Sequence, residues 1–391
     1  MGLLRRILLV LLMGSGAAVV QAQQDQVKPV KVAVFAPVYL DSAFVGDAYK
    51  LGNKAIPKYM LSGLDFYNGV MMAIDSLNAE NAPVEVLVYD SKSPDAIARV
   101  LTDDPELEGL SLIIASFNTR TEIKAVADLA KDHHVPLISS TYPSDGGITD
   151  NPYFVMLNPT LMAHIDGIFK FLQRNYPTDQ VILYRRKGNL EDMIQKALLN
   201  MNRTTQGTQV KFRTIMLQDT TGVAPILRGL DSTKQNIILC GSLDESFGRY
   251  VTRIVGNLHN YQSVVIGMPT WDGSNDIGKT AEIIYSTPYS LTRSDQLSKS
   301  LSAKYLALYG VRPSDMFYKG YESMYHFTKL ALKHGSTLID HLSDRDYKQF
   351  ADFDIQAVHS AKDSVRTEYL ENRKLYFIRK SSGKIKSVTG N

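Results

Sequence analysis

The feature that most constrains the fold is a regular alternation of short apolar runs with longer amphipathic segments. The apolar runs span residues 31–36, 84–89, 112–115, 135–138, 180–184, 210–217, 236–240, 263–267 and 282–285. The segments between them repeat apolar residues at the three- and four-residue spacing of a helix face, and they span residues 64–77, 96–101, 122–131, 163–174, 191–201, 223–230, 247–258, 295–309 and 318–334. Apolar strands separated by helices are typical of a parallel sheet covered on both faces. The sequence therefore predicts a doubly wound α/β protein.

The alternation runs once to about residue 157 and then restarts, which predicts two lobes. A chain of 391 residues is long for one domain, and its hydrophobic content of 44% can fill two cores. Residues 375–378 and 385–388 flank a Ser-Ser-Gly turn and predict a C-terminal β-hairpin. Residues 341–363 are polar and weakly periodic, so we assign no element to them.

The N-terminus predicts export. Arg5 and Arg6 precede an apolar run at residues 7–20, and Ala22 ends a small-residue cleavage site, so residues 1–22 have the pattern of a signal peptide. The run is shorter than a membrane-spanning helix needs, which favours cleavage over the alternative of a retained anchor. No lipobox cysteine lies near the cleavage site. We therefore expect a periplasmic protein that begins near Gln23.

Composition and motifs argue against several other classes. The formal net charge of +3 includes two leader arginines, so the exported chain is nearly neutral and lacks the charge of a nucleic-acid binder. Cys240 is the only cysteine, which excludes an intrachain disulfide and predicts a buried, inert thiol. We find no catalytic motif, no Walker loop and no dinucleotide fingerprint. His133 and His134 directly precede a predicted strand, so they are expected at the edge of the sheet that lies away from a ligand cleft. We expect no enzyme, no cofactor and no metal site.

Several strings occur in an order and spacing that resemble a known family. They span residues 32–39, 65–78, 86–90, 112–119, 125–130 and 135–140, with Glu371-Asn372-Arg373 near the C-terminus. Over nearly its whole exported length the chain resembles type I periplasmic binding proteins of the Leu/Ile/Val-binding kind. It is most similar to a branch common in Bacteroidetes-type bacteria and often joined to peptidoglycan-binding LysM repeats.

The resemblance implies two Rossmann-like lobes joined by three crossover segments. The crossings are expected near residues 157–159, near 286–288 and around 351–357. Lobe one would then combine residues 28–157 with 288–350. Lobe two would combine residues 158–287 with 351–391. Ligands of this family bind between the lobes, which close around them by a hinge motion.

In such sheets, ligands bind at the carboxyl ends of the strands. Residues 116–121 follow a strand and begin a helix, where hydroxyl and backbone N–H groups favour an anion. The resemblance implies that this loop and the next hold a ligand carboxylate, and we add two tyrosines at the same edge. The lobe-one candidates are Tyr39, Asn118, Thr119, Thr121, Ser140, Thr141 and Tyr142. Helix capping alone is the alternative for the threonines.

Lobe two offers candidates on the opposite wall. Asp244 or Glu245 would take a ligand ammonium, and Trp271 would stack on the ligand, with core packing as its alternative. Arg185 lies in an Arg-Arg-Lys loop where amino-acid binders carry glycine and tyrosine, which favours an anionic or larger ligand. The polar loop at residues 38–61 is either a lid over the cleft or a surface loop.

Two functions fit these features. The first is a solute-binding protein that captures a small polar or anionic ligand, such as an amino acid or peptide, for an inner-membrane ABC permease. The alternative is an envelope interaction module related to the lipoproteins that activate peptidoglycan synthases, with a peptidoglycan-synthesis protein as its partner. Nucleic acid is not expected as a partner of either.

Overall fold

The computed structural model describes most of the chain after residue 27. The described residues are 28–388 without 53–54, 103, 219–221, 273, 275, 291–292, 361–362, 364 and 382–383. The predicted signal peptide at residues 1–22 lies outside them. Within the described residues, no helix combines the length and the apolar character that crossing a membrane requires.

The first lobe is built on a seven-stranded sheet in the order β13-β14-β7-β6-β5-β1-β4. Its strands are β1 (Val30–Ala36), β4 (Val84–Asp90), β5 (Leu112–Ala115), β6 (Leu137–Ser139), β7 (Phe154–Met156), β13 (Ile355–His359) and β14 (Thr367–Asn372). All neighbours pair in parallel except β13 and β14. Alternate residues of β1 enter two cores, with Val32 and Val34 on one face and Phe35 on the other. This two-residue period is what a sheet covered on both faces requires.

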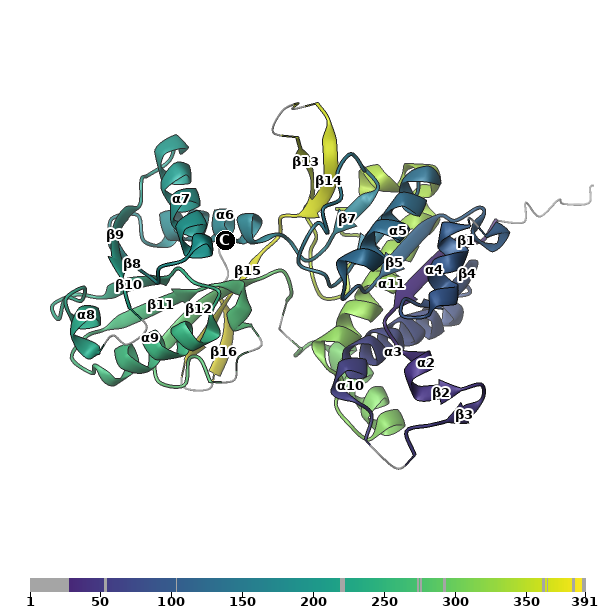
Figure 1. Cartoon of the computed structure of the whole chain (residues 1–391), viewed down its shortest axis with the longest axis horizontal. Coiled ribbons are helices and arrows are strands. Elements are labelled where there is room, and N and C mark those ends of the chain that lie inside the picture. The colour runs from purple at the N-terminus through teal and green to yellow at the C-terminus, as the bar shows by residue number, and fades with distance from the viewer. Residues whose placement is uncertain are drawn as a thin grey trace, which may run out of the picture.

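Helices cover both faces of this sheet. On the Val32 side lie α3 (Lys58–Ala79), α10 (Gln296–Tyr309) and α11 (Asp315–His334). On the Phe35 side lie α4 (Pro94–Leu101) and α5 (Arg120–Asp132). The lobe also contains α2 (Leu40–Ala43), β2 (Phe44–Val45), β3 (Ala48–Tyr49) and the short 3-10 helices η1 (Pro105–Leu107) and η3 (Gly335–His341). The polar loop at residues 38–61 thus carries a small helix and a two-stranded hairpin, which lie at the lower end of this lobe in Figure 1.

Helices α3 and α11 pack more closely than ordinary side chains allow. A Cβ added at Gly69 would lie 2.0 Å from the carbonyl oxygen of Phe317, and one added at Gly320 would lie 2.1 Å from that of Phe66. Glycine is therefore required at both positions, because the backbone of each helix occupies the space of the other's side chain. This contact fixes where α11 lies over the sheet.

The second lobe repeats the plan with a seven-stranded sheet in the order β16-β15-β12-β11-β10-β8-β9. Its strands are β8 (Gln180–Arg185), β9 (Lys211–Met216), β10 (Asn236–Cys240), β11 (Ser263–Gly267), β12 (Glu282–Thr287), β15 (Tyr376–Ser381) and β16 (Lys384–Val388). Its helices are α6 (Leu161–Asn175) and α7 (Asn189–Thr204) on one face, and α8 (Val223–Leu227), α9 (Glu245–Asn257) and the 3-10 helix η2 (Pro269–Trp271) on the other. β15 and β16 form the predicted C-terminal hairpin. The predicted fold class is confirmed.

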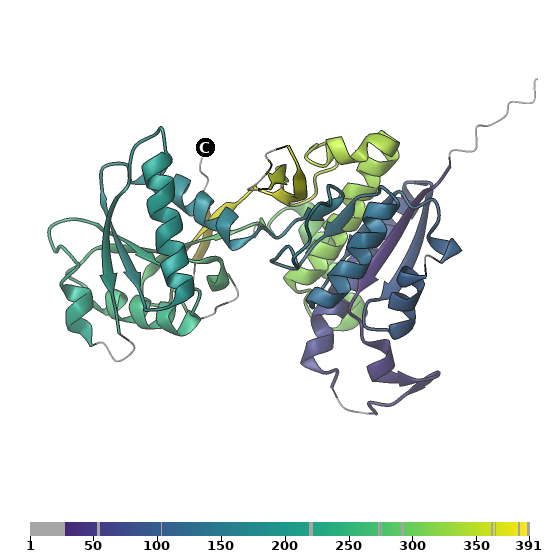
Figure 2. The ribbon, with the colours of Figure 1, turned by 45° about the horizontal axis from the view of Figure 1, so that its top comes forward.

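Three segments join the lobes, which lie side by side with a narrow waist between them (Figures 1 and 2). The first runs from β7 to α6, and the second leaves the end of β12 for α10. Two side chains of β14 hold the first segment. Glu371 accepts a 2.6 Å hydrogen bond from the Thr160 backbone N–H, and Asn372 donates a 3.1 Å bond to the Leu157 carbonyl.

The expected third crossing around residues 351–357 is wrong. β13 and β14 are strands of the first sheet, so the chain crosses only at residues 373–375, between β14 and β15. Residues 355–372 therefore belong to lobe one and not to lobe two. The cause is the exposed position of β13, which ends the sheet and pairs with one neighbour only. Such a strand has no continuous apolar face, and the sequence there shows no period.

Candidate ligand site between the lobes

A pocket of about 360 Å³ lies where the lobes meet. Its size suits a small ligand. Lobe one, lobe two and two of the joining segments all contribute to its wall, and the lining residues are Pro143, Asn158, Pro159, Leu161, His164, Leu243, Pro269, Thr270, Asp272, Ser286, Thr287, Pro288, Tyr289 and Lys319. Most of them follow the carboxyl ends of β6, β7, β10, β11 and β12. This is the edge at which open α/β sheets bind ligands.

Lys319 supplies a cation to this pocket from α11 of lobe one. Its ammonium nitrogen lies 3.7 Å from the ring centre of Tyr289, which is within range of a cation–π contact. The Tyr289 hydroxyl donates a 3.2 Å hydrogen bond to the Ser140 carbonyl, so the ring is held in place. Burial lowers the pKa of Lys319 to about 8, against the opposing effect of Asp315 and Asp272. The side chain is therefore charged at neutral pH but poorly solvated, which favours an anionic partner.

Asp272 supplies a carboxyl group from lobe two. Its Oδ2 accepts a 3.1 Å hydrogen bond from the Thr287 hydroxyl at the end of β12. Burial raises the pKa of this carboxyl above its usual value, which indicates that its charge is incompletely compensated in this structure.

His164 lines the pocket with an uncharged imidazole ring. Burial lowers its pKa to about 4, and its Nδ1 lies 2.9 Å from the Ser286 hydroxyl. The pocket therefore combines one cation and one carboxyl group from opposite lobes with uncharged polar and apolar surface. A small molecule that carries a carboxylate and an ammonium group matches this pattern.

None of the predicted ligand-binding residues lines this pocket, although residues 158–159 and 286–288 of the expected crossings do. Lys319 was missed because α11 has an apolar face and its polar residues carry no motif. The available signal for Asp272 was its place directly after Trp271, in the loop that follows a predicted strand. Tyr289 follows the second crossing, and nothing in its local pattern distinguishes it from a core tyrosine.

Some of the lobe-one candidates do come together, at a rim formed by the loops after β1, β4 and β5. Asn118 donates a 2.8 Å hydrogen bond to the Tyr39 hydroxyl. Tyr39 has a φ of 59°, a conformation held by Asp90, which accepts hydrogen bonds from the backbone N–H groups of residues 38–40. Tyr39 and Asn118 therefore form a small preorganised polar surface.

Thr119, at the same rim, is engaged within the protein. Its hydroxyl donates a 2.5 Å hydrogen bond to Glu122, which also forms an ion pair with Lys92. Thr121 lies exposed in the first turn of α5. The structure thus keeps both threonines near the strand ends, and their part in ligand binding stays a prediction.

In the next loop, the prediction for Ser140 is wrong. Its side chain is buried and its hydroxyl donates a 2.9 Å hydrogen bond to Ser323 of α11, so it is not offered to a ligand. The Thr141 hydroxyl lies 3.1 Å from that of Ser116 and is partly buried. Tyr142 packs at the edge of the core on the Phe35 side.

On lobe two, the prediction for Arg185 is wrong as well. Its side chain is only 4% exposed, and its guanidinium binds Asp192 and Gln195 of α7. The neighbouring Arg186 lies nearer the surface instead and forms a 2.8 Å ion pair with Asp244. A strand alternates its side chains between two faces, so a one-residue difference decides which arginine is buried.

Asp244 and Glu245 serve the start of α9. Asp244 is the N-cap and accepts hydrogen bonds from the backbone N–H groups of Ser246 and Phe247. Together with the Arg186 contact, these bonds lower the pKa of the Asp244 carboxyl against the opposing effect of burial. Glu245 is paired with Arg249 one turn later. Binding of a ligand ammonium by either residue stays a prediction.

The ligand-stacking role expected for Trp271 is wrong. The side chain is 0% exposed and belongs to the core between α9 and the second sheet. A Cβ added at Gly267 would lie 2.1 Å from the indole ring, and one added at Gly248 would lie 2.8 Å from the indole nitrogen. The two glycines therefore create the space that the ring fills, which is the core packing alternative.

Two doubly wound lobes that are joined by three segments and enclose a pocket between them are the architecture of two-lobed ligand-binding proteins. The sequence profile described as "Periplasmic binding protein" matches residues 58–346, which is most of the chain. The chain belongs to the periplasmic binding protein family. A search among curated proteins found no match.

Solved structures resemble the whole fold. A branched-chain amino acid ABC transporter periplasmic ligand-binding protein from Burkholderia xenovorans is 15% identical, with a TM-score of 0.59 over 92% of this chain and 94% of that one. An ABC transporter substrate-binding protein from Sphaerobacter thermophilus is 12% identical, with a TM-score of 0.56 over 93% and 97%. A third, from Desulfitobacterium hafniense in complex with Leu, is 11% identical, with a TM-score of 0.53 over 92% and 100%. At these identities the likeness establishes the type I two-lobed fold.

Proposed function

We propose that this protein is a periplasmic solute-binding protein that captures a small ligand between its lobes and passes it to an ABC-type permease. The observation that carries this proposal is Lys319, a poorly solvated cation in a pocket to which both lobes contribute. The family's periplasmic location agrees with the predicted leader at residues 1–22.

The charges in the pocket favour a ligand with a carboxylate. We infer that Lys319 binds this carboxylate and that Asp272, on the opposite lobe, binds an ammonium group. Free amino acids and short peptides carry both groups. The similar protein from Desulfitobacterium hafniense is a complex with Leu, which makes amino acids the first class to test.

The lobe-one rim would take part when the lobes close. Tyr39 and Asn118 are already hydrogen-bonded to each other at the strand ends. Hinge closure would bring this rim towards lobe two, as in other two-lobed binding proteins. We propose that the rim, including Thr119 and Thr141, contacts the ligand only in the closed form.

A thermal-shift screen followed by calorimetry tests the proposal. Amino acids, dipeptides and muropeptides are added to the exported chain, and a ligand at a hundredfold excess over its Kd stabilises the native state by about 2.7 kcal/mol. Lys319→Met keeps the length of the side chain and removes the charge. Because a hydrogen bond to a charged group contributes about 1.5–3 kcal/mol, this variant should bind about 10- to 150-fold more weakly.

Lys329→Met is the matched control. Lys329 lies on the same helix but pairs with Glu80 at the surface, so its loss should leave the ligand Kd unchanged. Wild-type affinity in Lys319→Met would contradict the assigned site. Loss of binding in Thr119→Ala or Thr141→Ala would support the rim, and unchanged binding in both would remove it from the proposal.

A second candidate function is an envelope interaction module, as in peptidoglycan-synthase activators and the LysM-associated Bacteroidetes-type branch. The exposed apolar side chains of the β2–β3 hairpin, namely Phe44, Val45 and Tyr49, favour it, because exposed apolar patches mark interaction surfaces. A screen in which no compound changes the melting temperature would favour this function over solute binding.

A further inference from the structure

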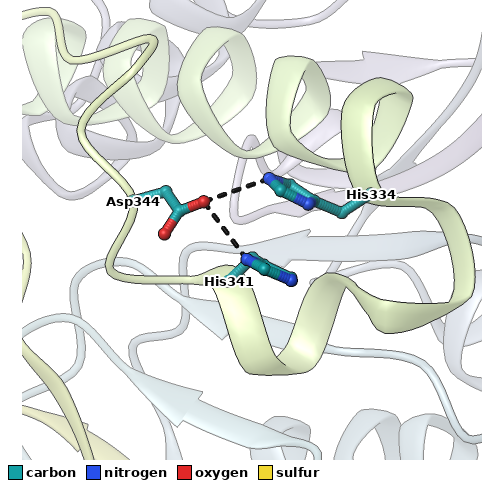
Figure 3. Close-up of side chains that lie close together, drawn as sticks. All are labelled: His334, His341 and Asp344. Atoms are coloured by element: carbon teal, nitrogen blue, oxygen red, sulfur yellow. Dashed lines mark hydrogen bonds and ion pairs between the residues drawn. The ribbon is translucent and has the colours of Figure 1, made fainter.

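Two histidines and an aspartate converge at the far end of α11 (Figure 3). The helix ends at His334, and Gly335 then adopts a φ of 55°, which a residue with a side chain rarely takes. The chain continues as η3, which brings His341 back beside His334. A backbone hydrogen bond of 3.0 Å from the Asp344 N–H to the His341 carbonyl turns the chain again, and the Asp344 carboxylate lies beside one nitrogen of each ring (Figure 3).

The three side chains lie at the spacing of metal ligands. Oδ2 of Asp344 is 3.1 Å from Nε2 of His334 and 3.2 Å from Nδ1 of His341. All three ligand atoms lie within 4.8 Å of one another. In a tetrahedral zinc site with bonds of about 2.0–2.1 Å, neighbouring ligand atoms are about 3.3 Å apart. The two distances from the histidine nitrogens to Oδ2 of Asp344 agree with this value.

A second observation points to a missing partner. Nε2 of His334 is buried and has no hydrogen-bond partner, although Asp344 lies 3.1 Å away, because the two groups are not aligned for a hydrogen bond. The opposing Nδ1 of His341 does form one with the same oxygen. Buried polar atoms are rarely left unsatisfied in native proteins, and a bound cation is one way to satisfy them.

We propose that His334, His341 and Asp344 bind one Zn²⁺ ion, with water in the remaining position. Two imidazole nitrogens and one carboxylate oxygen are a ligand set that Zn²⁺ accepts, and three protein ligands leave its fourth tetrahedral position open. The His334 and His341 rings are stacked 3.7 Å apart at an interplanar angle of 8°. Binding therefore requires the more exposed His341 ring to rotate, because the nitrogen lone pairs of two stacked rings lie in parallel planes and cannot meet at one ion.

This site is separate from the interlobe pocket. Lys319 and His334 lie on the same helix, and at about 1.5 Å of rise per residue they are roughly 22 Å apart. The ion would join the end of α11 to the segment that follows it. That segment leads to residues 350 and 351, whose backbone N–H groups bind Glu322 of α11. The expected role is thus to stabilise lobe one beside its last strands.

The test uses the exported chain without a histidine tag, treated with EDTA and dialysed. Zinc chloride is titrated by calorimetry, and the melting temperature is measured with and without the ion. We expect one Zn²⁺ per chain and a higher melting temperature with the metal. His341→Ala and Asp344→Asn each remove one ligand atom, and they should weaken binding at least tenfold, since the loss of supporting contacts alone typically costs about 10- to 100-fold.

His259→Ala is the matched control, because this histidine is exposed on lobe two and lies outside the cluster. Cys240 does not compete for the ion, since it is buried. Circular dichroism without metal shows whether each variant is folded. Asp344→Asn keeps the size of the side chain, so it removes the carboxylate ligand with little change in packing. Absence of binding to the wild type would overturn the proposal. So would equal affinity in the folded ligand variants, or an equal loss in His259→Ala.

Discussion

The contact between α3 and α11 allows a quantitative prediction. Gly320→Ala should lower the free energy of unfolding by about 2 kcal/mol. The new Cβ would lie 2.1 Å from the Phe66 carbonyl oxygen, a backbone atom that no side-chain rotation can move. Overpacking of this kind costs about 1–3 kcal/mol, and a backbone clash belongs at or above the upper end. Alanine recovers about 1 kcal/mol through its higher helix propensity.

The reciprocal glycine makes the prediction sharper. In Gly69→Ala the Cβ would meet the Phe317 carbonyl oxygen at 2.0 Å, so both substitutions push the same two helices apart. Once one alanine has separated them, the second meets less resistance. The double variant should therefore lose clearly less stability than the two single losses combined, which is the non-additivity expected of neighbouring sites.

Urea unfolding followed by circular dichroism measures these changes. Gly207→Ala is the control, because a Cβ there meets its nearest atom at 3.4 Å, which is ordinary contact. The control should stay within about 0.5 kcal/mol of the wild type. If Gly320→Ala did the same, the close approach of the two helices would be refuted. Additive losses in the double variant would refute the shared displacement.

Two further predictions concern pH. Lys319 has a pKa lowered to about 8, so a ligand carboxylate should bind more weakly as pH rises through 8. Above that pH the Kd should increase towards about tenfold per pH unit. Calorimetry from pH 7 to 9 measures this change, and an equally steep rise of the Kd in Lys319→Met would contradict the prediction. Burial raises the pKa of Glu322 from 4.5 to about 7, so the native state binds the proton more tightly than the unfolded state, and stability should fall by about 3 kcal/mol as pH rises from 4.5 through 7. Glu322→Gln should remove most of this slope in urea unfolding at pH 5 and pH 8, and an unchanged slope would assign it to another group.

Much of the fold could be predicted from the sequence because the signals are local. Strands such as β1 and β10 are buried on both faces, so each appears as a continuous apolar run. Helices such as α5 show one apolar face at helical spacing. β13 has neither pattern, since it ends the sheet and is largely exposed. Its pairing with β14 decides that it belongs to the first sheet and therefore where the third crossing falls. No periodic pattern in the local sequence indicates this pairing.

The sequence by itself determined the two doubly wound lobes, the C-terminal hairpin and the edge at which ligand-binding loops gather. It could not determine which side chains at that edge face a ligand. Arg185 and Trp271 follow strands as expected, yet each is buried by its own lobe. Lys319 lies on a helix distant in sequence from every predicted loop, and the packing of α3 against α11 decides its place in the pocket. The physical reason is that strand periodicity depends on neighbouring residues, whereas the direction of a side chain at a strand end depends on the elements packed around it.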